Sequence, residues 1–183
     1  GSVLGGSTGL LICGSAGIQK NPVAASDDSS GAIFAWADLR NGAADVYARR
    51  INPVGDTLWA THGNAIASGA GAQISPAIVS DGNRGAVIAW ADTASLLVAA
   101  QRVNGFGSAQ WGAGGVTLYS GLLPEKAGPA LVSDRVSGAI AVWAAAEPES
   151  LADIRAQRLY STGTLTPRFI TATAGLHGSV SPS

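Results

Sequence analysis

The sequence predicts an all-β fold made of repeated, four-stranded antiparallel sheets, and three observations predict it. One segment recurs at Pro22, Pro76 and Pro129, with spacings of 54 and 53 residues. Each copy contains four runs of five to eight residues rich in Val, Ile, Ala and aromatic residues. Gly, Asn, Asp and Pro separate the runs, which is typical of strands joined by turns. No apolar 3.6-residue period continues for ten residues, so helices are not expected.

The four runs of each repeat carry fixed landmarks. The first run ends at an aspartate, which is Asp27, Asp81 or Asp134. The second run follows a glycine and ends at a tryptophan, which is Trp36, Trp90 or Trp143. The third run contains an arginine, which is Arg50, Arg102 or Arg158, and a turn glycine follows it at Gly55, Gly107 or Gly163. The fourth run reads GNAIASG from Gly63, GVTLYSG from Gly115 and FITATAG from Phe169.

The second run of each repeat is apolar on both faces. In the first copy Ala32, Phe34 and Trp36 fall on one face of the predicted strand, and Ile33 and Ala35 fall on the other. A strand in a sheet with one solvent-exposed face would alternate apolar and polar residues instead. Sheets of four antiparallel strands that are covered on both faces are typical of β-propeller blades. A β-solenoid would need shorter coils, and tandem sandwich domains would need about twice the period.

The repeat boundaries predict one partial propeller domain with about 3.4 repeats of roughly 53 residues. Residues 1–21 would contain the last strand of a preceding blade, from about Gly9 to Gly14. Residues 22–75, 76–128 and 129–183 would form the first, second and third blades. Propellers use about four to eight blades, so one chain gives an incomplete ring. We expect further blades from a longer chain, from other copies or from a polymer, with strand donation as one route.

Composition excludes several function classes. Eleven basic and twelve acidic residues give a net charge of −1, which does not indicate a nucleic-acid or membrane-surface binder. One cysteine, Cys13, and two histidines are too few for an internal disulfide or a structural zinc site. No run of about eighteen apolar residues predicts a membrane span. No cofactor is therefore expected.

The first repeat resembles the extracellular β-propeller repeats of bacterial surface and secreted proteins. Those repeats read W-x-D-x-R, then D-[IV]-Y-A-[QR]-R, then G-x-x-x-W, and the matching residues are Trp36, Asp38, Arg40, Asp45, Arg50, Gly55 and Trp59. The later copies depart from this pattern at Ala94, Leu97, Ala145 and Pro167. The resemblance implies an extracellular or cell-surface location and no particular ligand. The sialidase Asp box and the quinoprotein blade motif do not fit, because Asp27 stands four residues before Gly31 and nine before Trp36.

The repeated aspartates allow two interpretations. Asp27, Asp81 and Asp134 precede turns, where a carboxylate commonly accepts backbone N–H groups. The doubled acid Asp27-Asp28 also allows calcium binding on an oxygen-rich loop. Because only the first repeat doubles the acid, we favour the turn interpretation.

The repeated arginines fall on the same face of their predicted strand as apolar residues. Arg50, for example, lies on the face of Val46 and Ala48. This placement directs Arg50, Arg102 and Arg158 against the next blade, where a buried charge needs a partner. Asp38 and Asp92, two residues after the blade tryptophans, are the expected partners. We therefore favour a structural network over a ligand-binding role for these arginines.

Trp59 and Trp111 lie before the fourth strand and offer two alternatives. Their flat faces could stack on sugar rings, or they could wedge between blades. Wedging is favoured, because Pro167 replaces the tryptophan in the third repeat.

No catalytic constellation emerges from the remaining residues. His62 and His177 occupy nonequivalent positions, and Glu147 and Glu149 flank a proline in one loop, which does not indicate a glycosidase pair. Cys13 is expected to be a small buried residue. The sequence predicts a noncatalytic structural or adhesive module that assembles with copies of itself or with the rest of a longer chain. A carbohydrate-binding propeller, with Trp59, Trp111 or Asp28 in its site, is the alternative, and a fragment of a propeller hydrolase is the third candidate.

Overall fold

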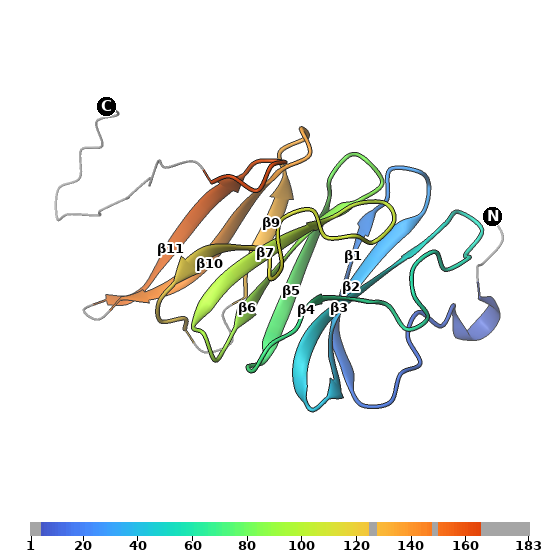
Figure 1. Cartoon of the computed structure of the whole chain (residues 1–183), viewed down its shortest axis with the longest axis horizontal. Helices are drawn as coiled ribbons and strands as arrows, with labels where there is room; N and C mark the ends of the chain where they lie inside the picture. Colours follow the sequence, from blue (N-terminus) through green and yellow to red (C-terminus); the bar gives the residue numbers. More distant parts are fainter. Residues whose placement is uncertain (1–4, 125–127, 148–149, 166–183) are drawn as a thin grey trace.

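The computed structural model describes residues 5–124, 128–147 and 150–165, and these residues form three antiparallel sheets (Figure 1). The predicted all-β class is confirmed. Sheet 1 contains β1 (Gln19–Ser26), β2 (Ala32–Asn41), β3 (Ala43–Ile51) and β4 (Asn64–Ala67). Sheet 2 contains β5 (Gln73–Ser80), β6 (Ala86–Asp92), β7 (Leu97–Val103) and β8 (Val116–Ser120). Sheet 3 contains β9 (Ala130–Ser133), β10 (Ala139–Glu147) and β11 (Ser150–Leu159).

Within each sheet the strands pair in chain order, each antiparallel to its neighbour. The first strand of sheets 1 and 2 carries a register shift at its proline, between Lys20 and Val23 in β1 and between Ile74 and Ala77 in β5. Proline has no N–H to donate to a ladder, so a β-bulge is a position where it is tolerated. The repeated Pro22 and Pro76 thus explain why the same irregularity recurs.

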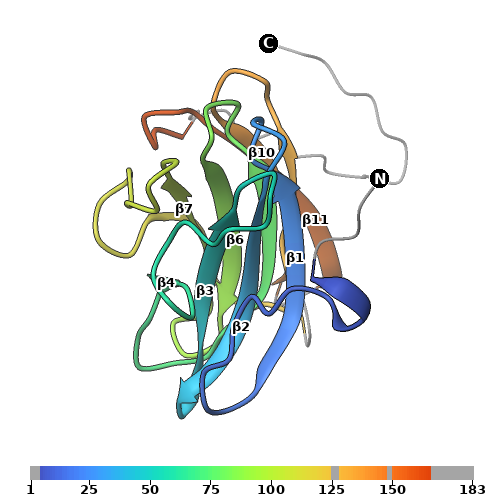
Figure 2. The ribbon, with the colours of Figure 1, turned by 90° about the vertical axis from the view of Figure 1, so that its right-hand side faces the viewer.

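The sheets stack face to face in chain order, as the two views in Figures 1 and 2 show. Between sheets 1 and 2 lies a core that includes Ile33, Ala35, Val46, Ala48, Ala86, Ile88 and Trp90. Between sheets 2 and 3 lies a core that includes Val87, Ala89, Val98, Ala139, Ala141, Trp143 and Leu159. Side chains alternate between the two faces of a strand, so β6 contributes to both cores. The alanines leave room for the sheets to approach closely.

Each stacked contact joins two different faces. The face that carries the strand tryptophan, called here the tryptophan face, packs against the preceding sheet. The opposite face, called here the aliphatic face, carries Ile33 in sheet 1 and Val87 in sheet 2, and it packs against the following sheet. This polarity gives the stack a direction along the chain.

The leading segment differs from its prediction. Residues 9–14 form no strand and follow a short 3-10 helix, Gly6–Thr8. The segment lies against sheet 1, where Arg49 donates to the carbonyl oxygen of Ile12 at 2.7 Å and the backbone N–H of Gly14 donates to Nδ1 of His62 at 3.2 Å. A strand needs a partner edge for its backbone groups. No strand within the described residues pairs with residues 9–14. The fourth run of the third repeat, from Phe169, lies outside the described residues.

Candidate functional site

In each sheet the repeated aspartate forms an ion pair with the repeated arginine, and this pair is called here the clasp. In sheet 1, Oδ1 of Asp27 accepts the backbone N–H groups of Ser29 at 2.8 Å and of Gly31 at 2.6 Å. Its Oδ2 accepts Nε and Nη2 of Arg50 at 2.9 and 2.7 Å. Burial by itself would raise the pKa of Asp27, but the hydrogen bonds from Arg50 and the two backbone groups lower it. One carboxylate thus closes the β1–β2 turn and fixes it to β3.

The other two sheets repeat the clasp. Asp81 pairs with Arg102 at 2.8 Å and Asp134 pairs with Arg158 at 2.9 Å. The prediction that Asp38 and Asp92 neutralise these arginines is therefore wrong. Strand parity placed the arginines on the correct face, but register decided their partners. Arg50 lies opposite Ile33 at one end of the β2–β3 ladder, whereas Asp38 lies opposite Asp45 near the other end.

A different polar cluster surrounds Asp38 in sheet 1. Its carboxylate accepts the indole N–H of Trp36 at 2.8 Å, Nη2 of Arg40 at 2.5 Å and the backbone N–H of Arg40 at 3.0 Å. Burial alone would raise the pKa of Asp38. The three donors outweigh burial and lower the pKa to about 2.

The second and third repeats lose parts of this cluster. Asp92 accepts Nε2 of Gln73 and the backbone N–H groups of Ala94 and Ser95. Burial would raise the pKa of Asp92, but these donors lower it. In the third repeat Ala145 replaces the aspartate, and among the described residues the buried indole N–H of Trp143 has no hydrogen-bond partner. The replacement of the aspartate by Ala145 therefore leaves a buried donor without its acceptor in this part of the chain.

Acid should destabilise the fold between about pH 4 and about pH 2. Asp27, Asp38 and Asp134 have lowered pKa values in the folded chain. Their stabilisation is present above the unfolded pKa and is lost as pH falls through the folded pKa. For Asp38 the shift from 3.8 to about 2 corresponds to about 2 kcal/mol.

Chemical denaturation as a function of pH measures this effect. Asp38→Asn should flatten the acid slope, whereas Asp153→Asn, at an exposed position, should keep it. A wild-type free energy of unfolding that stays constant from pH 5 to pH 2 would contradict the assigned hydrogen bonds.

Trp59 and Trp111 bind the next sheet. Both are buried, with 8% and 4% of their surface exposed. The indole N–H of Trp59 donates to the carbonyl oxygen of Gly105 at 3.1 Å, and that of Trp111 donates to the carbonyl oxygen of Ser161 at 3.0 Å. The structure therefore places both indoles between sheets, away from the solvent-facing position that sugar stacking requires.

Two of the three clasp arginines donate to the same two carbonyls. Nη1 of Arg50 lies 2.9 Å from the oxygen of Gly105, and Nη1 of Arg102 lies 3.2 Å from that of Ser161. Sequence reasoning missed these acceptors because a carbonyl has no residue signature. The signal was the repeated turn glycine two residues later. A Cβ at Gly107 or Gly163 would lie 2.9 or 2.8 Å from the indole of Trp59 or Trp111.

Asp28 is exposed and lies apart from the clasp, and the hydroxyl of Ser80 in sheet 2 donates a hydrogen bond to its carboxylate. The neighbouring Asp27 is fully buried and bound to Arg50. A guanidinium already occupies the oxygen that a calcium ion would need. In the described parts of the chain, no group of three or more His, Cys, Asp and Glu residues is placed to hold a metal ion.

The remaining candidates are dispersed. His62 accepts the backbone N–H of Gly14, and Cys13 is half-buried with its sulfur 3.4 Å from Nη2 of Arg40. Cys13 thus contacts polar groups, unlike the apolar core position expected for it. Glu147 ends β10. His177, Glu149 and Pro167 lie outside the described residues.

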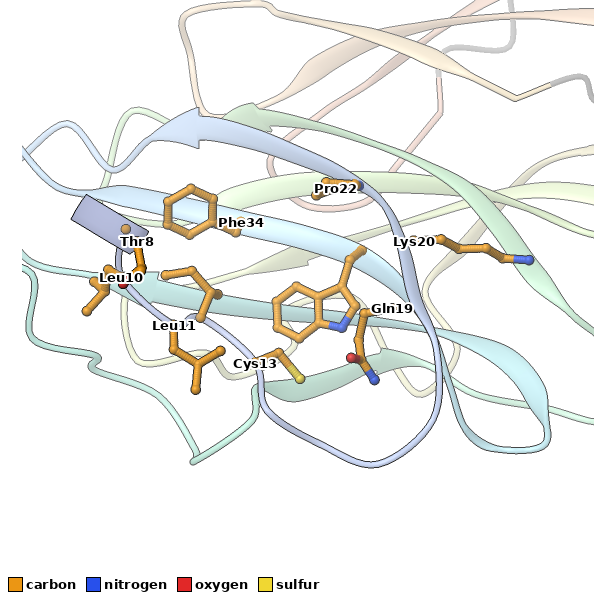
Figure 3. A pocket seen from close by; sticks show the side chains of 11 residues that line it. Thr8, Leu10, Leu11, Cys13, Gln19, Lys20, Pro22 and Phe34 are labelled. Carbon is orange, nitrogen blue, oxygen red and sulfur yellow. The ribbon is translucent and has the colours of Figure 1, made fainter. Parts of the chain in front are cut away.

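A cavity of about 480 Å³ lies between the leading segment and sheet 1. Figure 3 shows Leu10, Leu11 and Cys13 on one side and Pro22 and Phe34 on the other. Lys20 and Gln19 lie at its border, and the lining is mainly apolar. The cavity holds no nucleophile, base and orienting group in hydrogen-bond contact.

Comparison with known proteins gives no match, either to a protein-family model or to a curated protein. No helix within the described residues is long and apolar enough to cross a membrane.

Proposed function

We propose that this chain is a segment of a β-propeller and serves as a noncatalytic structural or adhesive module of an extracellular bacterial protein. Each stacked sheet would be one blade. Three antiparallel sheets, a repeat of roughly 53 residues and covering on both faces of the central sheet support this proposal. The extracellular location rests on the resemblance of the first repeat to bacterial surface propellers.

One observation carries the noncatalytic part of the proposal: the repeated polar and aromatic landmarks are used to hold sheets together. Asp27 and Asp81 close turns, Arg50 and Arg102 bind both their own sheet and the next one, and the indoles of Trp59 and Trp111 join the same carbonyls. Contacts within and between sheets thus explain why these residues recur, without a ligand. Calcium has no part in the proposal, because Arg50 already neutralises Asp27.

The carbohydrate-binding alternative requires exposed aromatic faces, since sugar rings stack on flat apolar surfaces. Burial of Trp59 and Trp111 removes the two indoles that the alternative assigned to its site. The hydrolase alternative requires carboxylates from outside this segment.

A glycan array and a panel of chromogenic glycosides test the proposal. The folded chain should give no glycan signal above that of a heat-denatured sample and should hydrolyse no substrate. Trp111→Phe is the diagnostic variant, because it keeps a large ring in the wedge but removes the donor to Ser161. A glycan signal that this variant abolishes, with an unchanged circular dichroism spectrum, would favour the lectin function. Hydrolysis by the wild-type chain would favour the enzyme.

A further inference from the structure

Sheet 3 presents an apolar face to solvent. Val132, Ile140, Val142 and Ile154 are 57%, 40%, 37% and 75% exposed. The repeat equates the last three with Ile33, Ala35 and Val46 in sheet 1 and with Val87, Ala89 and Val98 in sheet 2, all of which are at most 1% exposed. The following sheet covers these positions in sheets 1 and 2. The aliphatic face of sheet 3 therefore has the composition of a buried contact.

In sheet 1 it is the tryptophan face that is incompletely covered. Pro22 is exposed and Phe34 is half-buried, whereas the equivalent Pro76 and Ile88 in sheet 2 are buried. In sheets 2 and 3 the preceding sheet covers these positions. On sheet 1 the leading segment covers only part of the face, and the cavity of about 480 Å³ beside Phe34 lies between them (Figure 3).

The two open faces are complementary. Both contacts inside the chain join the aliphatic face of one sheet to the tryptophan face of the next. The open faces at the two ends of the stack are one of each kind. Two copies placed head to tail would repeat this contact a third time, whereas two aliphatic faces pressed together would not.

The polar contacts support the same direction. Arg50 and Arg102 each donate to a carbonyl in the β3–β4 or equivalent turn of the next sheet, at Gly105 and Ser161. The repeat equates these two residues with Pro53 in sheet 1, which is exposed. The third arginine, Arg158, has a side chain that is 40% exposed, compared with 11% for Arg50. Arg158 and the carbonyl of Pro53 thus form a donor and an acceptor at opposite ends of the stack.

We propose that a second copy of this chain docks head to tail, with its tryptophan face on the aliphatic face of sheet 3. Val142 and Ile140 would enter the cavity beside Phe34, and Arg158 would donate to the carbonyl oxygen of Pro53. This inference rests on the proposed structural function, whose sheets would continue across the molecular boundary. A contact between two different surfaces either closes into a ring or extends into a filament.

Sedimentation over a concentration range from about 1 μM to about 500 μM tests the proposal. The wild-type chain should form species larger than 18.2 kDa. Val142→Glu and Phe34→Glu should each weaken association at least about tenfold, because each places a charge in the apolar contact. Arg158→Met should weaken association about tenfold by removing the donor.

Mixing identifies the direction of docking. Val142→Glu retains an intact tryptophan face, and Phe34→Glu retains an intact aliphatic face. An equimolar mixture should therefore form a one-to-one dimer that grows no further. If two aliphatic faces met instead, Phe34→Glu alone would dimerise and mixing would add nothing, which would overturn the proposal.

Two controls keep the result interpretable. Val136→Glu changes an exposed apolar residue in the β9–β10 turn and should leave association unchanged. Pro22→Glu, at an exposed position on the tryptophan face, replaces Phe34→Glu if that variant loses its circular dichroism spectrum. A folded wild-type chain that stays monomeric throughout the range would overturn head-to-tail docking and leave both faces to further repeats of a longer polypeptide. The glycan and glycoside assays would still test the noncatalytic function separately.

Discussion

Arg50→Met should lower the free energy of unfolding by about 3 kcal/mol at pH 7. The substitution leaves the fully buried carboxylate of Asp27 without its cation. It also removes the donor to the carbonyl of Gly105 in the next sheet. Methionine retains much of the arginine stem, so the loss reports mainly on the charge and its hydrogen bonds. Urea denaturation followed by tryptophan fluorescence measures the effect.

Arg158→Met is the matched control for the dissociated chain, because it changes the same clasp in the sheet that has no following sheet among the described residues. Its partner Asp134 is nearly buried, but the side chain of Arg158 is 40% exposed. Water therefore screens the pair, and the expected loss is about 1 kcal/mol or less. Equal losses in the two variants would show that contact with the next sheet contributes nothing at Arg50. The deficit of Arg50→Met should also shrink as pH falls below about 4, because protonation of Asp27 removes the ion pair of the wild-type chain and the unpaired buried charge of the variant.

Gly85→Ala should destabilise the chain by about 3 kcal/mol, at the upper end for overpacking. A Cβ at this position would overlap the backbone carbonyl oxygen of Val103 and lie 2.7 Å from Oδ2 of Asp81. The backbone of the β6–β7 ladder cannot yield as a flexible side chain would. The new methyl group would therefore both separate the paired strands and displace the carboxylate of the clasp.

Gly69→Ala provides the control in the connection between β4 and β5. A Cβ there would lie 3.4 Å from Nε2 of Gln73, which is ordinary contact with the end of a side chain. The expected change is within about 0.5 kcal/mol. Thermal unfolding of both variants compares them directly. If Gly85→Ala were as stable as Gly69→Ala, steric exclusion of a Cβ would not explain the repeated glycine.

These two predictions concern the same structural unit, which recurs in each sheet. The glycine lets two strands and a carboxylate approach, the carboxylate closes the turn, and the arginine connects that carboxylate to the next sheet. Because Asp27 and Asp81 are buried, each part depends on the others for satisfaction of its charge or hydrogen bonds. A repeated site of this kind stabilises the stack.

The sequence alone determined the all-β class and the residues that recur in each repeat. Landmarks such as Gly31 and Trp36 recur because local rules on turns and strand alternation act on neighbouring residues. Those rules also placed Ile33 and Phe34 on opposite faces of β2, as the structure shows.

Only the tertiary structure decided which of these residues meet. Arg50 binds Asp27 and not Asp38, because the register of β2 against β3 sets the distance along the ladder. The carbonyls of Gly105 and Ser161 were invisible in the sequence, since any residue supplies the same acceptor. The leading segment has strand composition but forms no strand, because pairing requires an edge that a local pattern cannot supply. Contacts between distant segments depend on register and stacking, and these are properties of the whole chain.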